Sequence, residues 1–280
     1  MKVVLAEHAG ACYGVQRALD MAVVAAGEGE GASTLGPLIH NPQVVAELEA
    51  LGVRAVEGPE DVARGAVIIR SHGVTPAVRR AVVARDLPLI DATCPHVARA
   101  QKAAAELARR CGRVIVVGEE GHPEVEGLVA HACEAGGEVA VVASPSDLPA
   151  HLEAPVGIVV QTTQTREALD VIVAELEARG IQPEVKNTIC FATHQRQEAA
   201  AALADKVDAI VVIGGRNSSN TTRLADICAA ACSRTHHIES PEEIDPTWFA
   251  GCSAVGVTAG ASTPEVQISA VVARLETLEG

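Results

Sequence analysis

Three cysteines divide the 280-residue chain into thirds, and each is followed at the same interval by a polar residue. The pairs, each 28 positions apart by residue number, are Cys12 and His40, Cys94 and His122, and Cys190 and Ser218. An offset that occurs three times predicts that one supersecondary unit occurs three times. If the three copies pack around a pseudo-threefold axis, three thiols meet at the centre inside a ring of hydrogen-bonding side chains. Such an arrangement is typical of a metal cluster with a small polar ligand above it.

The segments between these residues also repeat. Short Val/Ile runs, such as those at 67–69, 114–117 and 158–160, alternate with helical patterns rich in Ala, Leu, Glu and Arg. Continuous apolar runs of this length are typical of parallel strands that helices cover on both faces. Ligands of such sheets bind beyond the carboxyl ends of the strands, which is where the cysteines and polar loops lie.

We therefore predict an α/β fold of three similar parallel-sheet α/β subdomains, arranged around a pseudo-threefold axis with a central iron–sulfur cluster. We expect one catalytic unit, residues 1–280, with subdomains at about 13–94, 95–190 and 191–280. The last helical pattern, from about Thr263, needs a following strand to complete its unit. Residues 1–11 can supply that strand, so we expect the N-terminus to complete the third subdomain.

Composition limits the classes of function. The chain carries a formal charge of −14 and has only one Trp, one Tyr and two Phe. The charge repels phosphate backbones, and the lack of aromatic residues leaves no stacking platform for bases, so we expect no nucleic-acid partner. The sequence has neither a secretory signal nor an apolar run of 18 residues, so we expect a cytoplasmic protein with no membrane partner.

Eight cysteines in such a protein favour metal or redox chemistry over a disulfide framework. Five of them are expected to be small buried hydrophobes: Cys111, Cys133, Cys228, Cys232 and Cys252. Cys228 and Cys232 lie four positions apart, on one helical face, with His236 and His237 close behind. A zinc site there is an alternative, although the neighbouring alanines favour plain helix packing.

Cys12, Cys94 and Cys190 each lie at a predicted strand-to-helix junction, where the helix N-terminus favours a thiolate. Three thiolates without a fourth protein ligand suit a [4Fe–4S] cluster with one open iron, or a [3Fe–4S] form that lacks it. Zinc with three thiolates and a water also fits the number of ligands. The surrounding hydroxyls and amides fit zinc less well, because they are arranged for an anion.

The polar residues around the thiols are nearly all neutral hydrogen-bonding groups. They are His40, His72, His122, Thr162, Ser218, Ser219, Asn220 and Ser262. Imidazoles, hydroxyls, amides and helix N-termini can hold a diphosphate without Lys or Arg. Glu124 follows His122 by two residues, so we predict a proton relay there, with a solvated surface glutamate as the alternative. The sequence has no GxxxxGK[ST] or GxGxxG motif, so it does not indicate nucleotide binding.

Over essentially its whole length the chain resembles the LytB/IspH family of 4-hydroxy-3-methylbut-2-enyl diphosphate reductases of the non-mevalonate isoprenoid pathway. The motifs that carry the resemblance are Cys12-Tyr-Gly-Val, Gly36-Pro-Leu-Ile-His-Asn41, Ser71-His-Gly-Val74, Asp91-Ala-Thr-Cys-Pro95, Gly121-His-Pro-Glu-Val-Glu-Gly127, Gln161-Thr-Thr163, Asn217-Ser-Ser-Asn220 and Thr258-Ala-Gly-Ala-Ser262. The chain differs at Ala9-Gly-Ala11, where many members have Pro-Arg-Gly-Phe, and at Phe191, where many have tyrosine. Neither change removes a predicted ligand.

The resemblance implies reductive dehydroxylation of the allylic diphosphate substrate to isopentenyl and dimethylallyl diphosphate, at a [4Fe–4S] cluster or, on isolation, a [3Fe–4S] form. It implies that Cys12, Cys94 and Cys190 bind the cluster, and that Glu124 delivers a proton with Thr162 positioning it. The residues implied to clamp the diphosphate are His40, His72, His122, Ser218, Ser219, Asn220 and Ser262. The implied electron donor is ferredoxin or flavodoxin. Arg109, Arg110 and Arg113 are candidates for its docking patch, with an ordinary solvated helix end as the alternative.

Two other functions remain open. Quinolinate synthase is also similar to a threefold α/β enzyme with three cluster cysteines, although the Asn-Ser-Ser-Asn and His-Pro-Glu loops argue against it. A non-catalytic iron–sulfur sensor or electron carrier is the second. Such a protein usually has four protein ligands to its cluster and needs no diphosphate site, so an open iron beneath a polar ring favours an enzyme.

Overall fold

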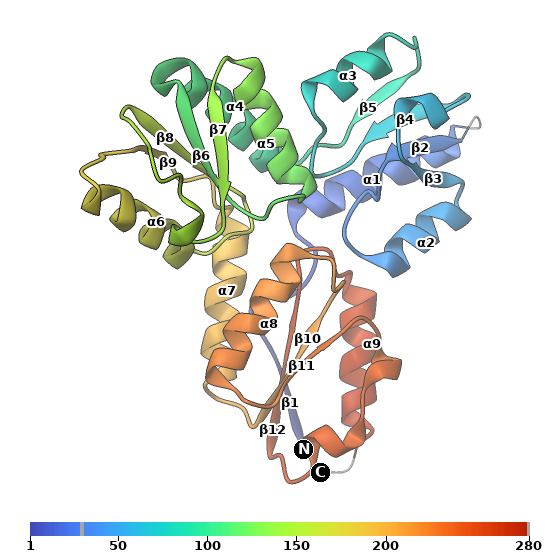
Figure 1. The fold of residues 1–280 in the computed structure, drawn as a ribbon. Coiled ribbons are helices and arrows are strands. Elements are labelled where there is room, and N and C mark those ends of the chain that lie inside the picture. The colour runs from blue at the N-terminus through green and yellow to red at the C-terminus, as the bar shows by residue number, and fades with distance from the viewer. Residues whose placement is uncertain (29–30, 279–280) are drawn as a thin grey trace. The chain divides into compact units, whose positions relative to one another are not determined.

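The computed structural model describes residues 1–28 and 31–278, and these residues form three four-stranded sheets (Figure 1). Every strand pairing in the described chain is parallel. The predicted α/β fold with three similar parallel-sheet subdomains is therefore confirmed. Residues 279–280, to which the third subdomain was predicted to extend, lie outside the described chain.

The three sheets have the same strand order. The first is β3 (Val53–Val56), β2 (Ala32–Leu35), β4 (Ala66–Ile69) and β5 (Leu89–Asp91). The second is β7 (Glu138–Val142), β6 (Arg113–Val117), β8 (Val156–Val160) and β9 (Glu184–Lys186). The third is β11 (Thr235–Ile238), β10 (Ala209–Ile213), β12 (Ala254–Ala259) and β1 (Lys2–Leu5). The N-terminal strand β1 therefore has the position in its sheet that β5 and β9 have in theirs.

The helices also repeat in order. The second strand in each of these orders, β2, β6 or β10, leads into α2 (Pro42–Ala50), α5 (Pro123–Glu134) or α8 (Ser219–Ala231). The strand listed before it, β3, β7 or β11, leads into a 3-10 turn: η1 (Pro59–Asp61), η2 (Pro145–Asp147) or η3 (Pro241–Glu243), the last followed by η4 (Pro246–Phe249). The third leads into α3 (Pro76–Val83), α6 (Arg166–Ala178) or α9 (Glu265–Glu276). The fourth is followed by a cysteine and then α1 (Tyr13–Gly27), α4 (Pro95–Cys111) or α7 (Phe191–Ala204).

The 3-10 turns show how the sequence fixes the repeat locally. Each begins with a proline, whose fixed φ suits the first helical position, and contains an acid two residues later. That acid accepts a hydrogen bond from the backbone N–H of the capping residue, as in a capping box. The pairs are Gly58 and Asp61 at 3.1 Å, Ser144 and Asp147 at 2.8 Å, and Ser240 and Glu243 at 3.2 Å.

The second sheet is buried on both faces, which explains its continuous apolar runs. Val114 and Val116 of β6 face a cluster built from α4 and α5, whereas Ile115 and Val117 face a cluster built from α6. Helix α4 approaches β8 closely at Gly157, where an added Cβ would lie 2.8 Å from the Cβ of Leu107. Only glycine allows this helix-to-sheet distance.

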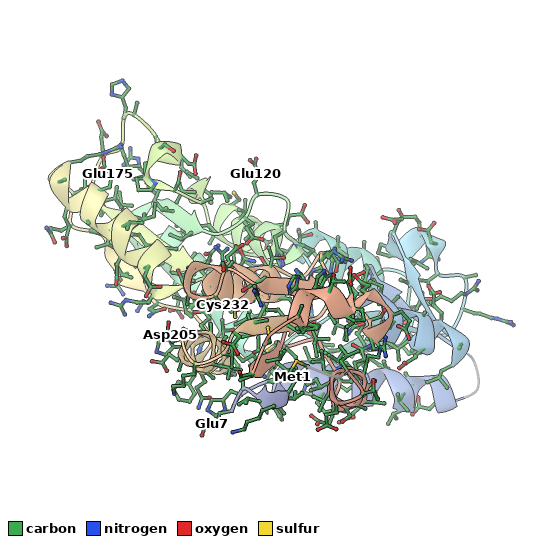
Figure 2. All side chains as sticks on the ribbon, turned by 90° about the horizontal axis from the view of Figure 1, so that it is seen from below. Met1, Glu7, Glu120, Glu175, Asp205 and Cys232 are labelled. Atoms are coloured by element: carbon green, nitrogen blue, oxygen red, sulfur yellow. The ribbon has the colours of Figure 1, made fainter. Side chains whose placement is uncertain are left out.

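The third sheet is packed in the same way. Val211 of β10 faces a cluster that includes α9, and Val212 faces a cluster that includes α7 and α8. Met1 packs against the first of these clusters and Cys232 belongs to the second; both are labelled in Figure 2. The N-terminal strand therefore contributes to the core of a sheet whose other strands come from the C-terminal third.

The chain separates into two compact units. The first contains the described residues of 1–15, 40–43 and 191–280, and the second contains 16–39 and 44–190. The short segment 40–43 belongs to the first unit because its amides are bound there. The Nδ2 atom of Asn41 donates to the carbonyl of Ser262 at 2.9 Å, and the Nε2 atom of Gln43 donates to the carbonyl of Glu239 at 3.0 Å. The subdomain boundaries at 94 and 190 remain predictions.

Among the helices of the described chain, none is both long and apolar enough to span a bilayer. The expected cytoplasmic location remains a prediction.

Candidate active site

The three predicted ligand cysteines occupy equivalent backbone positions. Each follows the fourth strand of a sheet, and its N–H donates to a carbonyl in the loop that follows the third strand. The bonds are Cys12 to Ala261 at 3.1 Å, Cys94 to Ser71 at 2.9 Å and Cys190 to Thr162 at 3.0 Å. One hydrogen bond therefore fixes the backbone of each cysteine in the same way, as the repeat predicts.

The local environment of these cysteines suits metal binding. All three are half-buried and none forms a disulfide. Cys94 is the N-cap of α4, and its side chain makes no capping bond to the helix. A helix N-terminus stabilises negative charge, so a thiolate is favoured at this position.

The other cysteines have different surroundings. Cys111, Cys228, Cys232 and Cys252 are buried as predicted, whereas Cys133 is exposed, so the prediction of a buried thiol there is wrong. Sγ of Cys228 lies 4.0 Å from the carbonyl of Ala200, and Sγ of Cys232 lies 3.9 Å from that of Val207. These contacts fit the packing role predicted for both thiols.

His236 and His237, which follow this cysteine pair in the sequence, make contacts with other groups. The ring of His236 stacks on Trp248 with centroids 4.0 Å apart, and Nε2 of His237 lies 2.8 Å from the carbonyl of Gly214. The structure therefore gives no support to the alternative zinc site.

In the second unit, a chain of contacts links two of the cysteine junctions. Ser71, which accepts the Cys94 bond, precedes His72, and the ring of His72 lies edge-on to that of His122 at 5.6 Å. His122 is bonded to Glu124, which is bonded to Thr162, the acceptor for Cys190. This unit therefore brings together Cys94, His72, His122, Glu124, Thr162 and Cys190.

Glu124 is the buried acid of this network. It lies in the first turn of α5 and is only 2% exposed. Its Oε1 atom accepts from the backbone N–H of Thr162 at 2.6 Å, and its Oε2 atom accepts from the hydroxyl of Thr162 at 2.8 Å. Burial raises the pKa of Glu124 to about 7, against the opposing effect of both Thr162 bonds. The alternative of a solvated surface glutamate is therefore wrong.

His122 is the N-cap of α5. Its Nδ1 atom accepts from the backbone N–H of Glu124 at 3.1 Å, so in the neutral ring Nε2 carries the proton. Burial lowers the pKa of His122; the carboxylate of Glu119 opposes this effect and the guanidinium of Arg70 adds to it. The ring is therefore a neutral N–H donor at neutral pH.

Thr162 has a different position in the repeat from the other polar loop residues. Its carbonyl accepts the cysteine bond, as those of Ser71 and Ala261 do, whereas His72 and Ser262 come one residue later. Its hydroxyl is bonded to Glu124. Thr162 therefore connects the Cys190 junction to the buried acid.

In the first unit, the remaining predicted residues lie on three adjoining loops. Ser262 follows Ala261, the acceptor for Cys12, and its own carbonyl accepts from Asn41, the neighbour of His40. The carbonyl of His40 lies so close to Gly215 that a Cβ there would be 2.7 Å from it. The loop at Gly215 leads into α8. This unit therefore brings together Cys12, His40, Ser218, Ser219, Asn220 and Ser262.

The N-terminus of α8 has the properties of an anion site. Ser218 is its N-cap, and Ser219 and Asn220 are buried in its first turn. In the part of the chain that the structure describes, neither Nδ2 nor Oδ1 of Asn220 has a hydrogen-bond partner. Buried amides are normally bonded, so this group is available to a polar ligand at a helix N-terminus, which favours anions.

Sequence reasoning missed three residues that build these loops. Asn41 is buried and links Ser262 to Gln267, with both bonds at 2.9 Å. Arg17 donates to carbonyls just before Cys94, and Arg196 to a carbonyl just before Cys12. The recurrence of an arginine five or six residues after each cysteine is the signal that could have found the last two.

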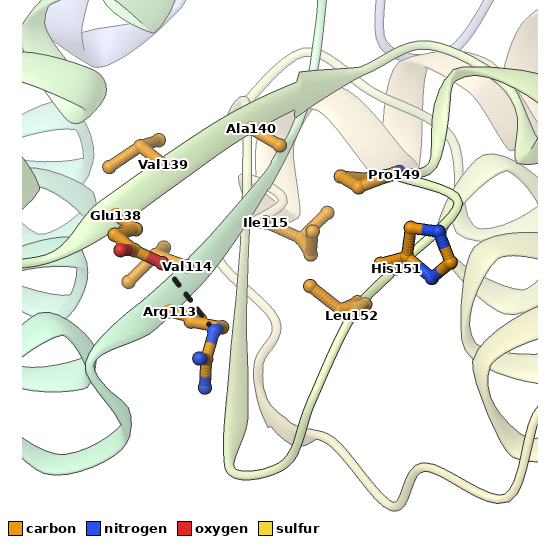
Figure 3. A pocket seen from close by; sticks show the side chains of 9 residues that line it. All are labelled: Arg113, Val114, Ile115, Glu138, Val139, Ala140, Pro149, His151 and Leu152. Carbon is orange, nitrogen blue, oxygen red and sulfur yellow. Dashed lines mark ion pairs between the residues drawn. The ribbon is translucent and has the colours of Figure 1, made fainter.

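A separate pocket of about 180 Å³ lies at the amino ends of β6 and β7 (Figure 3). Arg113, at its rim, is paired with Glu138 at 3.5 Å. None of the predicted site residues lines it, as expected when the site lies at the carboxyl ends of the strands.

Comparison with known proteins identifies the family. The family model described as LytB protein matches residues 3–276. The 4-hydroxy-3-methylbut-2-enyl diphosphate reductase of Geobacter sulfurreducens is 49% identical over 280 residues, covering 99% of this chain and 97% of the relative. The protein of the same name from Citrifermentans bemidjiense is 48% identical over 283 residues, covering 100% of this chain and 98% of the relative.

Two solved structures are similar along almost the whole chain. A structure of (E)-4-hydroxy-3-methyl-but-2-enyl diphosphate reductase, described as the terminal enzyme of the non-mevalonate pathway, has 43% identity and a TM-score of 0.72, with 99% of both chains covered. The E-1-hydroxy-2-methyl-but-2-enyl-4-diphosphate reductase of Plasmodium falciparum has 25% identity and a TM-score of 0.88, covering 99% of this chain and 88% of that one. With a family model that spans nearly all of its residues and relatives that share almost half of them, the chain belongs to the LytB protein family.

Proposed function

We propose that this chain is an enzyme that reduces 4-hydroxy-3-methylbut-2-enyl diphosphate to isopentenyl diphosphate and dimethylallyl diphosphate. The reaction breaks the allylic C–O bond and consumes two electrons and two protons. One proton leaves with the hydroxyl as water, and the other forms the new C–H bond. The observation that carries the proposal is the buried carboxyl of Glu124, bonded to Thr162 beside a neutral His122. Family membership argues against the quinolinate synthase alternative.

The proposed cofactor is a [4Fe–4S] cluster held by Cys12, Cys94 and Cys190, with a [3Fe–4S] form when one iron is lost. Three half-buried thiols at equivalent helix N-termini fit such a cluster, and they leave one iron without a protein ligand. When bound, the cluster supplies the electrons and a Lewis-acidic iron for the leaving hydroxyl. The electrons come from a ferredoxin or a flavodoxin.

The chain's own polar groups bind the diphosphate. Ser218, Ser219 and Asn220 present hydroxyls, an amide and backbone N–H groups at the start of α8. His40, His72, His122 and Ser262 add neutral donors. The buried Asn220 amide supports this assignment, because a diphosphate oxygen would complete its hydrogen bonding.

Glu124 supplies the proton. A carboxyl whose pKa is about 7 is partly protonated at neutral pH, so it can donate a proton and recover it from solvent between turnovers. The hydroxyl of Thr162 holds the carboxyl in place at 2.8 Å. The neutral ring of His122 presents its Nε2–H group as a hydrogen-bond donor.

The activity itself can be tested with a small reductant. Under anaerobic conditions, protein with close to four irons is expected to oxidise reduced methyl viologen when 4-hydroxy-3-methylbut-2-enyl diphosphate is added. Substrate-dependent bleaching and both diphosphate products by mass spectrometry would support the proposal. Absence of turnover from iron-loaded protein would contradict it.

The cluster ligands can be tested by iron content. Cys12→Ser, Cys94→Ser or Cys190→Ser is expected to lower bound iron and the visible absorption of the protein, because a hydroxyl is a poor ligand for iron–sulfur clusters. Cys133→Ser is the control, since Cys133 is exposed and outside the three junctions. Equal iron in all four variants would rule out the proposed ligand set.

The role of Glu124 can be tested with an isosteric amide. Glu124→Gln keeps the size of the side chain and removes the titrating proton, so turnover is expected to fall about 10²-fold or more. Iron content and substrate KM should stay close to the parent values. Turnover within twofold of the parent would remove Glu124 from proton transfer.

The hydroxyl of Thr162 can be tested through the pH profile. The carboxyl must be protonated to donate, so kcat is expected to fall as the pH rises through about 7. Thr162→Val removes a bond that stabilises the charged carboxylate, so the pKa of Glu124 rises and this fall moves to higher pH. Thr162→Ser keeps the hydroxyl and should retain the parent profile. A profile that is the same in both variants would show that this bond does not tune Glu124.

A further inference from the structure

The helix after each ligand cysteine carries an arginine at a matching position: Arg17, Arg99 and Arg196. Two of these arginines bind backbone just before another cysteine. Arg17 donates to the carbonyls of Asp91 at 3.3 Å and Thr93 at 3.2 Å, ahead of Cys94. Arg196 donates twice to the carbonyl of Gly10, at 3.0 and 2.7 Å, ahead of Cys12. The repeat predicts that Arg99 should bind the backbone ahead of Cys190.

Arg99 bonds to a side chain of its own helix instead. Its guanidinium is exposed and bonds to Nδ1 of His96, on its own helix, at 3.1 Å. Between Arg99 and the residues ahead of Cys190, Asn187 and Thr188, lies an open groove of about 500 Å³. The groove therefore occupies the place where the other two junctions are closed by an arginine.

This groove, between α4 and β9, is basic. Arg99, Lys102 and Lys186 line it together with one acid, Glu106, which gives a local formal charge of +2 on a chain of −14. The ion pair between Lys102 and Glu106 spans 3.9 Å on the surface, and the Lys102 side chain is 77% exposed. Lys186 is paired in a similar way with Glu184, at 3.7 Å. Exposed pairs of this length hold their lysines weakly, so both ammonium groups are available to an acidic partner.

We propose that the groove between α4 and β9 is the docking surface for a small acidic one-electron carrier protein. This inference rests on the proposed function, which requires such a donor. The groove is lined by two segments that lead to two of the three proposed cluster ligands, helix α4 after Cys94 and residues 185–188 before Cys190. Cys94 is the N-cap of α4, so Arg99 and Lys102 lie only about 8 and 12 Å further along the helix axis. Lys186 ends β9, four residues before Cys190.

The charge distribution favours this occupant. An acidic protein is repelled by most of a surface with a net charge of −14, so a local basic groove directs its approach. A long polyanion such as RNA would extend onto the acidic surroundings and be repelled there. Electron-transfer encounters use small interfaces, which suits a groove of this size. A lysine on an edge strand commonly prevents strand pairing, but that role does not explain Arg99 and Lys102 on the facing helix.

The arginines predicted from the sequence as a docking patch fit less well. Arg110 is paired with Glu184 at 2.8 Å, and Arg113 lies between Glu138 and Glu153 at 3.5 and 3.3 Å. Arg109 and Arg110 also lie roughly 22 to 24 Å along the axis of α4 from Cys94, much further than Arg99 and Lys102.

The test uses the iron-loaded protein with Lys102→Glu and Lys186→Glu combined. The matched control combines Lys206→Glu and Arg54→Glu, two exposed residues outside the groove, and changes the net charge equally. At low salt, binding of an oxidised acidic [2Fe–2S] ferredoxin is measured without substrate. The groove variant is expected to bind about tenfold or more weakly, and the control close to the parent. Salt should weaken binding to the parent more steeply than binding to the groove variant.

Turnover provides the second readout. The groove variant should lose about tenfold in kcat/KM for ferredoxin while its viologen-driven rate stays at the parent value. Parent-like ferredoxin binding in the groove variant would overturn the proposal, as would an equal loss in the control or an equal loss of viologen-driven turnover. If the parent protein failed to turn over with viologen, the proposed function would fail, and the binding measurement would still decide the role of the groove.

Discussion

The backbone hydrogen bond from each of Cys12, Cys94 and Cys190 to the loop after the third strand recurs in both units of the structure. It joins the two loops that carry the chemistry in each repeat, and it has nearly the same length, 2.9 to 3.1 Å, in all three. Because both partners are backbone groups, the bond depends on the sheet order and not on any side chain. The acceptor position can therefore carry a different side chain in each loop while the backbone of the cysteine stays fixed. The differences between Ser71, Thr162 and Ala261 illustrate that freedom.

Burial of Glu124 destabilises its charged carboxylate relative to the neutral carboxyl. A pKa raised from 4.5 to about 7 corresponds to roughly 3 kcal/mol against the charged carboxylate in the folded state. The folded state is therefore more stable when Glu124 is neutral than when it is charged. This contribution to the free energy of unfolding is fully present below the pKa of Glu124 in the unfolded chain, and it is lost as the pH rises through about 7. Thr162 limits this loss by donating two hydrogen bonds to the carboxylate. In the proposed reaction, this destabilisation of the charged form keeps a proton on Glu124, which is the group proposed to donate it.

Much of the fold could be predicted because its signals are local. The Val/Ile runs indicated the parallel strands, and the cysteine spacing indicated three equivalent junctions. The burial of Glu124 could not be read in the same way, since its partner Thr162 lies 38 positions away in the sequence. The sequence also could not show that Arg17 binds a backbone carbonyl ahead of a cysteine whereas Arg99 does not. Both lie five residues after a cysteine, and only the path of the neighbouring backbone decides which of them reaches a carbonyl.

The pairing of β1 with β12 determines which parts of the fold can form before others during translation. Lys2 is made long before its partner Ala254, so among the strand pairings of the described residues this one has the longest loop to close. The junctions of Cys94 and Cys190 use partners made before them, Ser71 and Thr162, and can form during translation. The Cys12 junction must wait for Ala261. A cofactor that needed all three thiols could therefore be inserted only after Ala261 had been made, and a chain cut before that residue would lack the Cys12 junction.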